Sequence, residues 1–237
     1  MAQPRNLAPN LWIVDQPDFS AGPARIGTRM TVIRLADGGL FLHSPTLFDE
    51  ETRQSLDALG NVRAVIATSR AHHLFVADYI KTWPTAKLYG PPGLTGDIQD
   101  FRGRFGARRD LKLDSILGDE APPEWAGQIE QHLFKGARAL NEVVFFHPSS
   151  RSVIFADLVF NVPADAKGAP IFYALVGRGH FGPHRFIRLM IRNRAAARES
   201  VARILNWNFD RVIVTHGDVL ESGGREKFAK AFSYLSP

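Results

Sequence analysis

Several apolar segments of this chain stop at a side chain that can bind a metal ion or carry a proton. The first, residues 62–67, runs into a polar loop that contains two adjacent histidines, and two later segments stop at Asp157 and His216. Short apolar runs bounded by polar residues are typical of buried strands, and imidazole is both a common metal ligand and a proton carrier. We therefore expect three strands whose ends meet at one edge of the fold and form one site there.

The rest of the chain alternates strands with helices, which predicts a layered structure built from both. Alternation and turn residues predict strands at residues 11–15, 30–35, 40–43, 62–67 and 87–90. Helical spacing of apolar residues predicts a helix at residues 185–205. Helices are also expected at residues 49–59 and at residues 74–83, where Pro84 ends the helix. The glycines within residues 36–39 favour a tight turn between the second and third strands, because glycine tolerates positive φ.

Composition narrows the class of protein. Of the 237 residues, 45% are hydrophobic, so we expect a substantial core and a single domain over residues 1–237. The chain has no cysteine, which excludes disulfides, thiolate metal sites and a cysteine nucleophile. Its first residues lack the apolar core of a signal peptide, and no apolar run approaches the ~20 residues of a membrane span. We expect a soluble, cytoplasmic protein with no membrane partner. The sequence indicates no oligomeric state.

The strand ends, in this order, resemble the motifs of the metallo-β-lactamase superfamily. In that family one strand leads to H-x-H-x-D-H, a later strand ends at an aspartate, and a last strand ends at a histidine before glycine. The resemblance covers most of the chain from about Leu11 onward, and residues 141–148 are similar to an uncharacterised branch with a divergent metal site. It implies an α+β fold, a four-layer αββα sandwich with two mixed β-sheets face to face and helices outside.

The first motif is degenerate in this chain. Thr68 and Arg70 stand where the family has its first two histidines, His72 replaces the aspartate, and His73 matches the closing histidine. A threonine hydroxyl is a poor zinc ligand, and arginine only donates hydrogen bonds. Two unit charges repel by ~4 kcal/mol at about 4 Å in a medium of intermediate dielectric, so Arg70 opposes a cation. We therefore expect no tightly bound pair of zinc ions.

The later motifs are better preserved. The family's middle histidine falls near Arg138, a second positive charge, whereas Asp157 and His216 match their motifs. The resemblance thus implies His73, Asp157 and His216 as metal ligands, with His72 or His147 as a candidate fourth. Two histidines and one carboxylate suit a single, weakly held divalent metal such as zinc, iron or manganese. In this hypothesis Asp157 and His73 are also the candidate catalytic residues.

Other roles stay open for the same side chains. Arg70 could pair with Asp157 and place a guanidinium where the metal would lie. Asp157 could instead cap its loop by accepting backbone N–H groups, and His73 and His216 could make structural hydrogen bonds. His147, in a short connection between two predicted strands, is expected to belong to a turn.

Candidate binding residues surround this set. Arg70, His72 and Arg138 occupy motif positions, and His180 and His184 lie in the glycine-rich stretch at residues 177–184. That stretch is expected to be a loop bordering the site, which makes its histidines candidate substrate contacts.

Three functions are consistent with these features. With a metal bound, the protein would be a hydrolase acting on an ester, amide or phosphoester of an unknown small molecule. With the pocket filled by Arg70, it would be a non-catalytic binding or regulatory protein. The third candidate function is binding of RNA or another polyanion. It is suggested by the net charge of +5, by the glycine- and arginine-rich patch at residues 101–109, and by Arg185, Arg188 and Arg192 on one helix face. We favour nucleic acid least, because arginine stems often only cover apolar surface.

Overall fold

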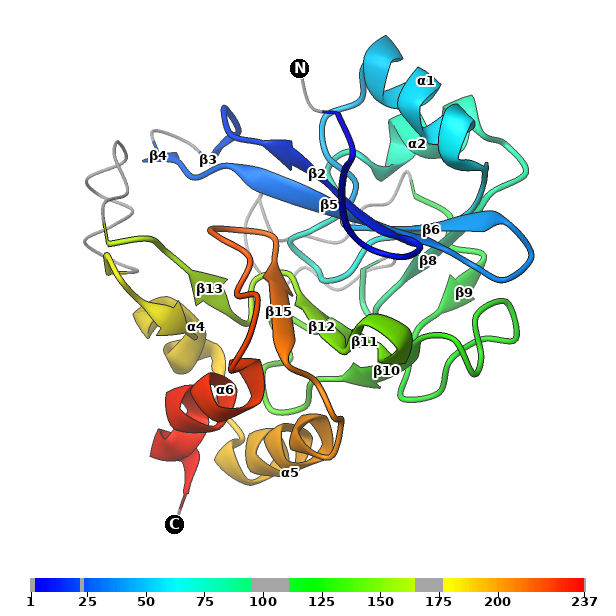
Figure 1. Cartoon of the computed structure of the whole chain (residues 1–237). Coiled ribbons are helices and arrows are strands. Elements are labelled where there is room, and N and C mark those ends of the chain that lie inside the picture. Colours follow the sequence, from blue (N-terminus) through cyan, green and yellow to red (C-terminus); the bar gives the residue numbers. More distant parts are fainter. Residues whose placement is uncertain (1–2, 22–23, 95–110, 165–176, 237) are drawn as a thin grey trace.

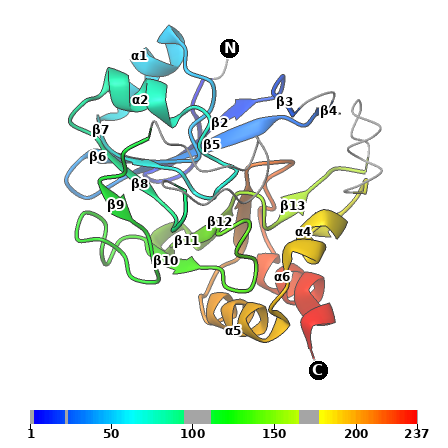
Figure 2. The same cartoon turned by 180° about the vertical axis from the view of Figure 1, so that it is seen from behind.

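The structure, a computed structural model, describes residues 3–21, 24–94, 111–164 and 177–236 (Figure 1). Within these ranges two β-sheets face each other and helices lie on their outer sides, as Figures 1 and 2 show from opposite directions. The four-layer αββα arrangement expected from the sequence is therefore confirmed. The glycine- and arginine-rich patch at residues 101–109 lies outside the described ranges.

The first sheet has seven strands in the order β1-β2-β5-β6-β7-β8-β9. Neighbours are antiparallel from β1 to β6 and parallel from β6 to β9, so the sheet is mixed. All five strands predicted between residues 11 and 90 belong to it, with bounds that differ by at most two residues. Its strands are β1 (Arg5–Ala8), β2 (Leu11–Gln16), β5 (Thr28–Arg34), β6 (Gly39–His43), β7 (Asn61–Ile66), β8 (Lys87–Gly90) and β9 (Ser115–Ile116).

The second sheet has four strands in the order β10-β11-β12-β15 and is also mixed, because β12 and β15 are parallel and the other pairs antiparallel. Its strands are β10 (Glu130–Leu133), β11 (Val143–His147), β12 (Ser152–Phe155) and β15 (Arg211–Val214). Two short ribbons complete the strand pairing, β3 (Ser20–Ala21) with β4 (Ala24–Arg25) and β13 (Phe160–Asn161) with β14 (Phe181–Gly182).

Helices cover the outer face of each sheet. On the first sheet lie α1 (Glu50–Leu59) and α2 (Val76–Thr82), and on the second lie α4 (Arg185–Met190), α5 (Arg194–Leu205) and α6 (Gly224–Phe232). Single 3₁₀ turns form η1 (Pro148–Ser150) and η2 (Ser233–Leu235). In the described ranges, none of the helices has the length and apolar character needed to cross a membrane.

The predicted helix at residues 185–205 is in fact two helices. The chain leaves helical geometry at residues 191–193, and Asn193 begins α5 by accepting the backbone N–H of Ala196 at 3.0 Å. Asparagine is among the strongest N-cap residues, because its side chain satisfies an N–H group that has no partner inside the helix. The apolar spacing was correct on both sides of the break, but it could not reveal the break itself.

Three hydrophobic clusters correspond to the three interfaces between four layers. One lies between α1, α2 and the first sheet, one between the sheets, and one between the second sheet and α4 to α6. Strand alternation sends neighbouring side chains to different clusters: in β11, Val143 and Phe145 face the first sheet, whereas Val144 and Phe146 face the helices. This alternation fixes which strand ends can reach a common edge.

The arginines of α4 and α5 contact the C-terminal turn. Arg194 and Arg198 donate hydrogen bonds to the carbonyl oxygens of Tyr234 and Leu235. The Arg188 guanidinium lies over the Tyr234 ring, 4.5 Å from its centroid, which is a favourable cation–π distance. These contacts give the basic residues a structural role, and polyanion binding stays a prediction.

His43, at the end of β6, is a histidine buried between the two sheets. Its side chain is 0% exposed and packs edge-on against Phe145, with ring centroids 5.5 Å apart. In the described part of the chain neither ring nitrogen has a hydrogen-bond partner. Burial, together with repulsion from His72, lowers the pKa of His43 to about 3, so the ring stays neutral in the folded protein.

We expect acid to destabilise the metal-free protein partly through His43. The unfolded chain protonates His43 near its ordinary pKa of 6.5, whereas the folded chain does so only near pH 3, so the unfolding free energy falls as pH drops below 6.5. For this residue the loss is at most about 2 kcal/mol between pH 6.5 and pH 5. Urea unfolding at both pH values should show a smaller loss in His43→Leu than in wild type. Equal losses would contradict the buried, neutral state of His43.

Candidate metal centre

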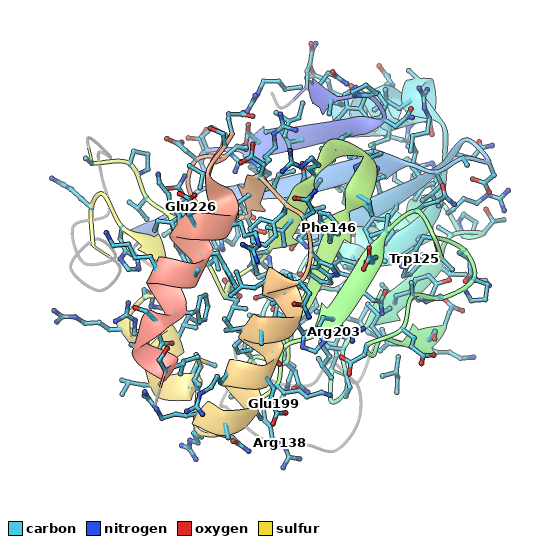
Figure 3. The ribbon with its side chains drawn as sticks, turned by 60° about the horizontal axis from the view of Figure 1, so that its bottom comes forward. Trp125, Arg138, Phe146, Glu199, Arg203 and Glu226 are labelled. Carbon is cyan, nitrogen blue, oxygen red and sulfur yellow. The ribbon has the colours of Figure 1, made fainter. Side chains whose placement is uncertain are left out.

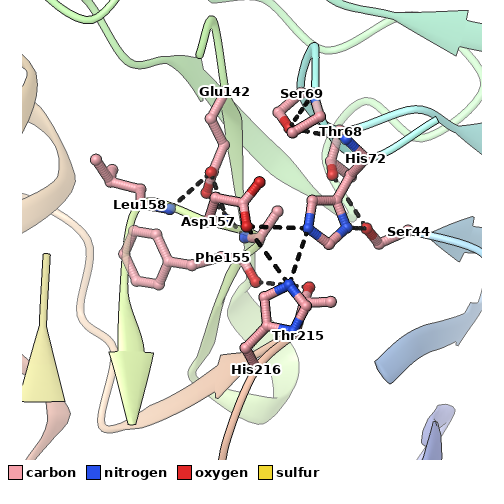
Figure 4. Close-up of polar contacts among 12 residues, drawn as sticks. Ser44, Thr68, Ser69, His72, Glu142, Phe155, Asp157, Leu158, Thr215 and His216 are labelled. Atoms are coloured by element: carbon pink, nitrogen blue, oxygen red, sulfur yellow. Dashed lines mark hydrogen bonds and ion pairs between the residues drawn. The ribbon is translucent and has the colours of Figure 1, made fainter. Parts of the chain in front are cut away.

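The ends of β7, β12 and β15 meet at one edge of the sandwich. The loops that follow them bring His72, Asp157 and His216 together, with one ligand atom of each within 4.8 Å of the others (Figure 4). Oδ1 of Asp157 lies 3.1 Å from Nε2 of His72 and 3.4 Å from Nε2 of His216. The two Nε2 atoms are 3.2 Å apart. These three side chains form a group that could hold a metal ion.

The first sheet orients His216, although His216 follows a strand of the second. Its Nδ1 lies 2.7 Å from the carbonyl oxygen of Gly27, in the turn before β5. A carbonyl only accepts hydrogen bonds, so Nδ1 carries a proton, and Nε2 is the ring nitrogen that faces Asp157 at 3.4 Å. A metal-binding histidine needs this tautomer when it coordinates through Nε2.

The loop that carries His216 is held on both sides. Buried Arg29 of β5 donates to the carbonyl oxygens of Val214 at 2.7 Å and Gly217 at 2.8 Å. Gly217 has a φ of +103°, and a Cβ there would lie only 2.1 Å from the carbonyl oxygen of Asn161 in β13. Any other residue at this position would displace the loop from β13.

Hydroxyl groups orient His72. Its Nδ1 is 2.7 Å from Oγ of Ser44, which lies 3.2 Å from Oγ1 of Thr68, the residue found where the motif has its first histidine. Oγ of Ser69 accepts the backbone N–H groups of Ala71 and His72 at 3.1 Å each, which folds the loop into a tight turn. This turn aims His72 at the group.

Burial and neighbouring charges shift the pKa values of His72 and Asp157 in opposite directions. Burial would lower the pKa of His72, but the attraction of Asp157 and Glu142 raises it above its ordinary value. Burial would raise the pKa of Asp157, but His72 and His216 hold it far below its usual range. Asp157 is therefore ionised at physiological pH and available to a cation.

The buried carboxylate of Glu142 holds the loop that contains Asp157. Its two oxygens accept the backbone N–H groups of Ala156, Asp157 and Leu158 at 2.8, 2.7 and 2.8 Å (Figure 4). Burial and the charge of Asp157 raise the pKa of Glu142 to about 7, against the effect of the three N–H groups. This role of Glu142 was not predicted from the sequence. A charged residue directly before the apolar strand at residues 143–147 was the available signal.

The remaining motif residues lie elsewhere. Among the described residues, His73 is not part of the group: it is buried, and His72 occupies the place expected for it. Arg70 is also buried, and its backbone N–H donates to the carbonyl oxygen of Leu140 at 3.0 Å. Arg138 is exposed, on the side of the molecule that carries α5 (Figure 3). The roles proposed for these side chains stay predictions.

Two of the predicted binding histidines lie beside the β13–β14 ribbon. His180 and His184 lie on either side of β14 in the sequence. β14 pairs with β13, the strand that follows Asp157. In the described part of the chain, Nε2 of His180 is buried and makes no hydrogen bond. His147, in contrast, bonds Ser149 and Ser150 in the η1 connection between β11 and β12.

The geometry of the group fits a metal ion. Zinc binds imidazole nitrogen and carboxylate oxygen at about 2.0–2.2 Å, so ligand atoms in a tetrahedral site lie about 3.3–3.5 Å apart. The observed separations of 3.1, 3.2 and 3.4 Å are close to this spacing. The second nitrogen of each imidazole is held by a carbonyl or a hydroxyl, as is usual for metal-binding histidines.

Comparison with protein families matches residues 9–175 to a domain of unknown function, DUF4336. The chain belongs to this family. The matched part of the chain includes six of the seven strands of the first sheet (β2 and β5 to β9), the loop with His72, and Asp157, whereas β1 and His216 lie outside it. A comparison with curated protein sequences gives no match.

Solved metallo-β-lactamases share the fold of this DUF4336 chain. An enzyme from Pontibacter korlensis matches with a TM-score of 0.65 at 12% identity and covers 99% of each chain. One from Hirschia baltica gives 0.62 at 16% identity, over 99% of this chain and 97% of the other. FIM-1 from Pseudomonas aeruginosa, in its mono-zinc form, gives 0.61 at 12% identity, over 100% and 97%. The chain is a divergent member of the metallo-β-lactamase fold, and such identities establish the fold alone.

We expect Glu142→Gln to lower the unfolding free energy by about 1–3 kcal/mol, because an amide in place of one carboxylate oxygen leaves a buried N–H group without an acceptor. Chemical unfolding followed by circular dichroism measures the difference. Glu120→Gln, at an exposed glutamate, is the matched control and should stay within about 0.5 kcal/mol of wild type. Equal stability of the two variants would exclude the anchoring role of Glu142.

Proposed function

We propose that this DUF4336 protein is a metal-dependent hydrolase that holds a single divalent ion through His72, Asp157 and His216. The observation that carries the proposal is the convergence of three ligand atoms, from three strand ends, at separations of 3.1 to 3.4 Å. The mono-zinc form of FIM-1, a structural relative, supports a one-metal state for this fold. Thr68 and Arg70, in place of two histidines, argue against a second zinc ion of the usual kind.

A divalent ion at such a site lowers the pKa of bound water and polarises a carbonyl or phosphoryl oxygen. The side chains of this protein supply charge and orientation. Asp157 stays ionised and balances the charge of the ion, while Gly27 and Ser44 hold the two imidazoles in place. Two histidines and one carboxylate leave positions open for water and substrate. The substrate class that fits this chemistry is an ester, amide or phosphoester.

A non-catalytic binding protein is the competing function, and one observation favours it. His72 and Asp157 already form a close ion pair, and the raised pKa of His72 favours its charged form beside the carboxylate. Such a pair is stable without a metal. Metal content separates the two functions, because only the first needs an ion at the group.

Protein supplied with zinc, manganese or iron and then dialysed should retain about one equivalent of metal, as expected for a single site with three protein ligands. His72→Ala, Asp157→Ala and His216→Ala should each abolish retention, because each removes one ligand atom. Inductively coupled plasma mass spectrometry measures the metal content.

Two further variants make this measurement specific. His147→Ala, in the η1 connection, should retain metal like wild type. If His73→Ala retains metal and His72→Ala loses it, His72 is the ligand, as in the observed group. If His72→Ala retains metal and His73→Ala loses it, His73 is the ligand, as expected from the sequence. A wild-type protein that retains no metal would contradict the proposal and support the binding protein.

Ser44→Ala should weaken metal affinity about 10- to 100-fold, because it removes the hydroxyl that orients His72. Competition with a chromophoric chelator gives the affinity. Ser149→Ala is the matched control, since Ser149 also bonds a histidine, His147, at 2.9 Å. If both variants bind metal as wild type does, Ser44 does not position a ligand.

A further inference from the structure

The β13–β14 ribbon places His184 beside the metal-binding group. The backbone N–H of Asn161 in β13 donates to the carbonyl oxygen of His216 at 3.4 Å, and the N–H of Asp218 donates to that of Asn161 at 2.8 Å. The ribbon is thus bound to the loop that carries a proposed ligand. His184 follows β14 by two residues, so its backbone position is set by this ribbon.

A stack of rings connects His184 to the group. The Phe160 ring lies parallel to that of His216, with centroids 5.2 Å apart and an interplanar angle of 16°. The His184 ring packs edge-on against Phe160 at 4.7 Å. The distance between the centroids of the His184 and His216 rings is therefore at most the sum of these two distances. The partly exposed ring of Phe186 lies parallel to that of His184 at 6.3 Å and forms the outer side of the stack.

The tautomer of His184 follows from its hydrogen bond. Its Nδ1 accepts the backbone N–H of Phe186 at 3.2 Å, where His184 is the N-cap of α4. An accepting Nδ1 carries no proton, so in the neutral ring the proton is on Nε2. This N–H has no hydrogen-bond partner among the described residues.

We infer that His184 is a substrate-binding residue whose Nε2–H donates a hydrogen bond to the carbonyl or phosphoryl oxygen of the substrate at the metal centre. The inference rests on the proposed function, because it places the substrate between His184 and the group formed by His72, Asp157 and His216. The esters, amides and phosphoesters of the proposed function all carry an oxygen that can accept this hydrogen bond. Phe160 and Phe186 form apolar surface on either side of the donor.

Electrostatics agree with a neutral donor. Burial lowers the pKa of His184 to about 4; His180 and His216 add to this effect and Asp157 opposes it. The ring is therefore neutral at physiological pH, and it binds oxygen through a fixed N–H group rather than through charge. A neutral donor also adds no positive charge beside a divalent ion.

Nuclear magnetic resonance of the full chain with ¹⁵N-labelled histidine rings tests the tautomer directly. Long-range ¹H–¹⁵N correlation on zinc-loaded protein should show His184 with a protonated Nε2 and an unprotonated Nδ1, and His184→Asn identifies its signals. Addition of inorganic phosphate, as a probe oxyanion, should shift the Nε2 signal. The expected affinity for phosphate is about tenfold lower in His184→Asn, which corresponds to the loss of one hydrogen bond.

His184→Asn is suited to this test, because asparagine is also a good N-cap and can keep α4 in place while removing the Nε2–H donor. His147→Asn is the control and should bind phosphate like wild type. A proton on Nδ1 of His184, or equal phosphate affinity in wild type and His184→Asn, overturns the inference. Failure of wild type to retain zinc contradicts the proposed function instead. The tautomer and the phosphate response of the zinc-free protein then still decide the role of His184.

Discussion

The ionised carboxylate of Asp157 lies between the Nε2 atoms of His72 and His216, at 3.1 and 3.4 Å, and this contact constrains both sheets. A buried carboxylate is costly unless cationic or hydrogen-bonding groups surround it. The chain meets this condition with two imidazoles, and it holds the loop itself through the three backbone N–H groups that Glu142 accepts. The two neighbouring carboxylates therefore have different roles. Glu142 binds the backbone of the loop that contains Asp157, and Asp157 faces the two imidazoles.

The group also links the two halves of the sandwich. His72 follows β7 of the first sheet, whereas Asp157 and His216 follow strands of the second. His216 and its loop are held by Arg29 of β5 and by Gly27, in the turn before β5. The first sheet and its preceding turn thus orient a side chain contributed by the second sheet. Metal affinity and the packing of the sheets should therefore depend on one another, because a shift between the layers would separate the ligand atoms.

Much of the fold could be predicted because burial on both faces of a strand leaves a clear apolar pattern. The five strands between residues 11 and 90 were found in this way. The break between α4 and α5 was not, because it depends on a single cap, Asn193, inside a segment with continuous helical spacing. The placing of Asp157 and His216 near each other could be predicted, since each directly follows an apolar strand.

The sequence alone determined that three apolar strands end in potential ligands and that the first motif lacks two of its histidines, because residue types and strand periodicity are local properties. Only the tertiary structure decided which of two adjacent histidines joins the group. The turn held by Ser69 directs neighbouring side chains differently, and it is His72 that meets Asp157. Glu142, Ser44 and Gly27 likewise came from distant segments. Their roles depend on contacts between layers, which no local pattern records.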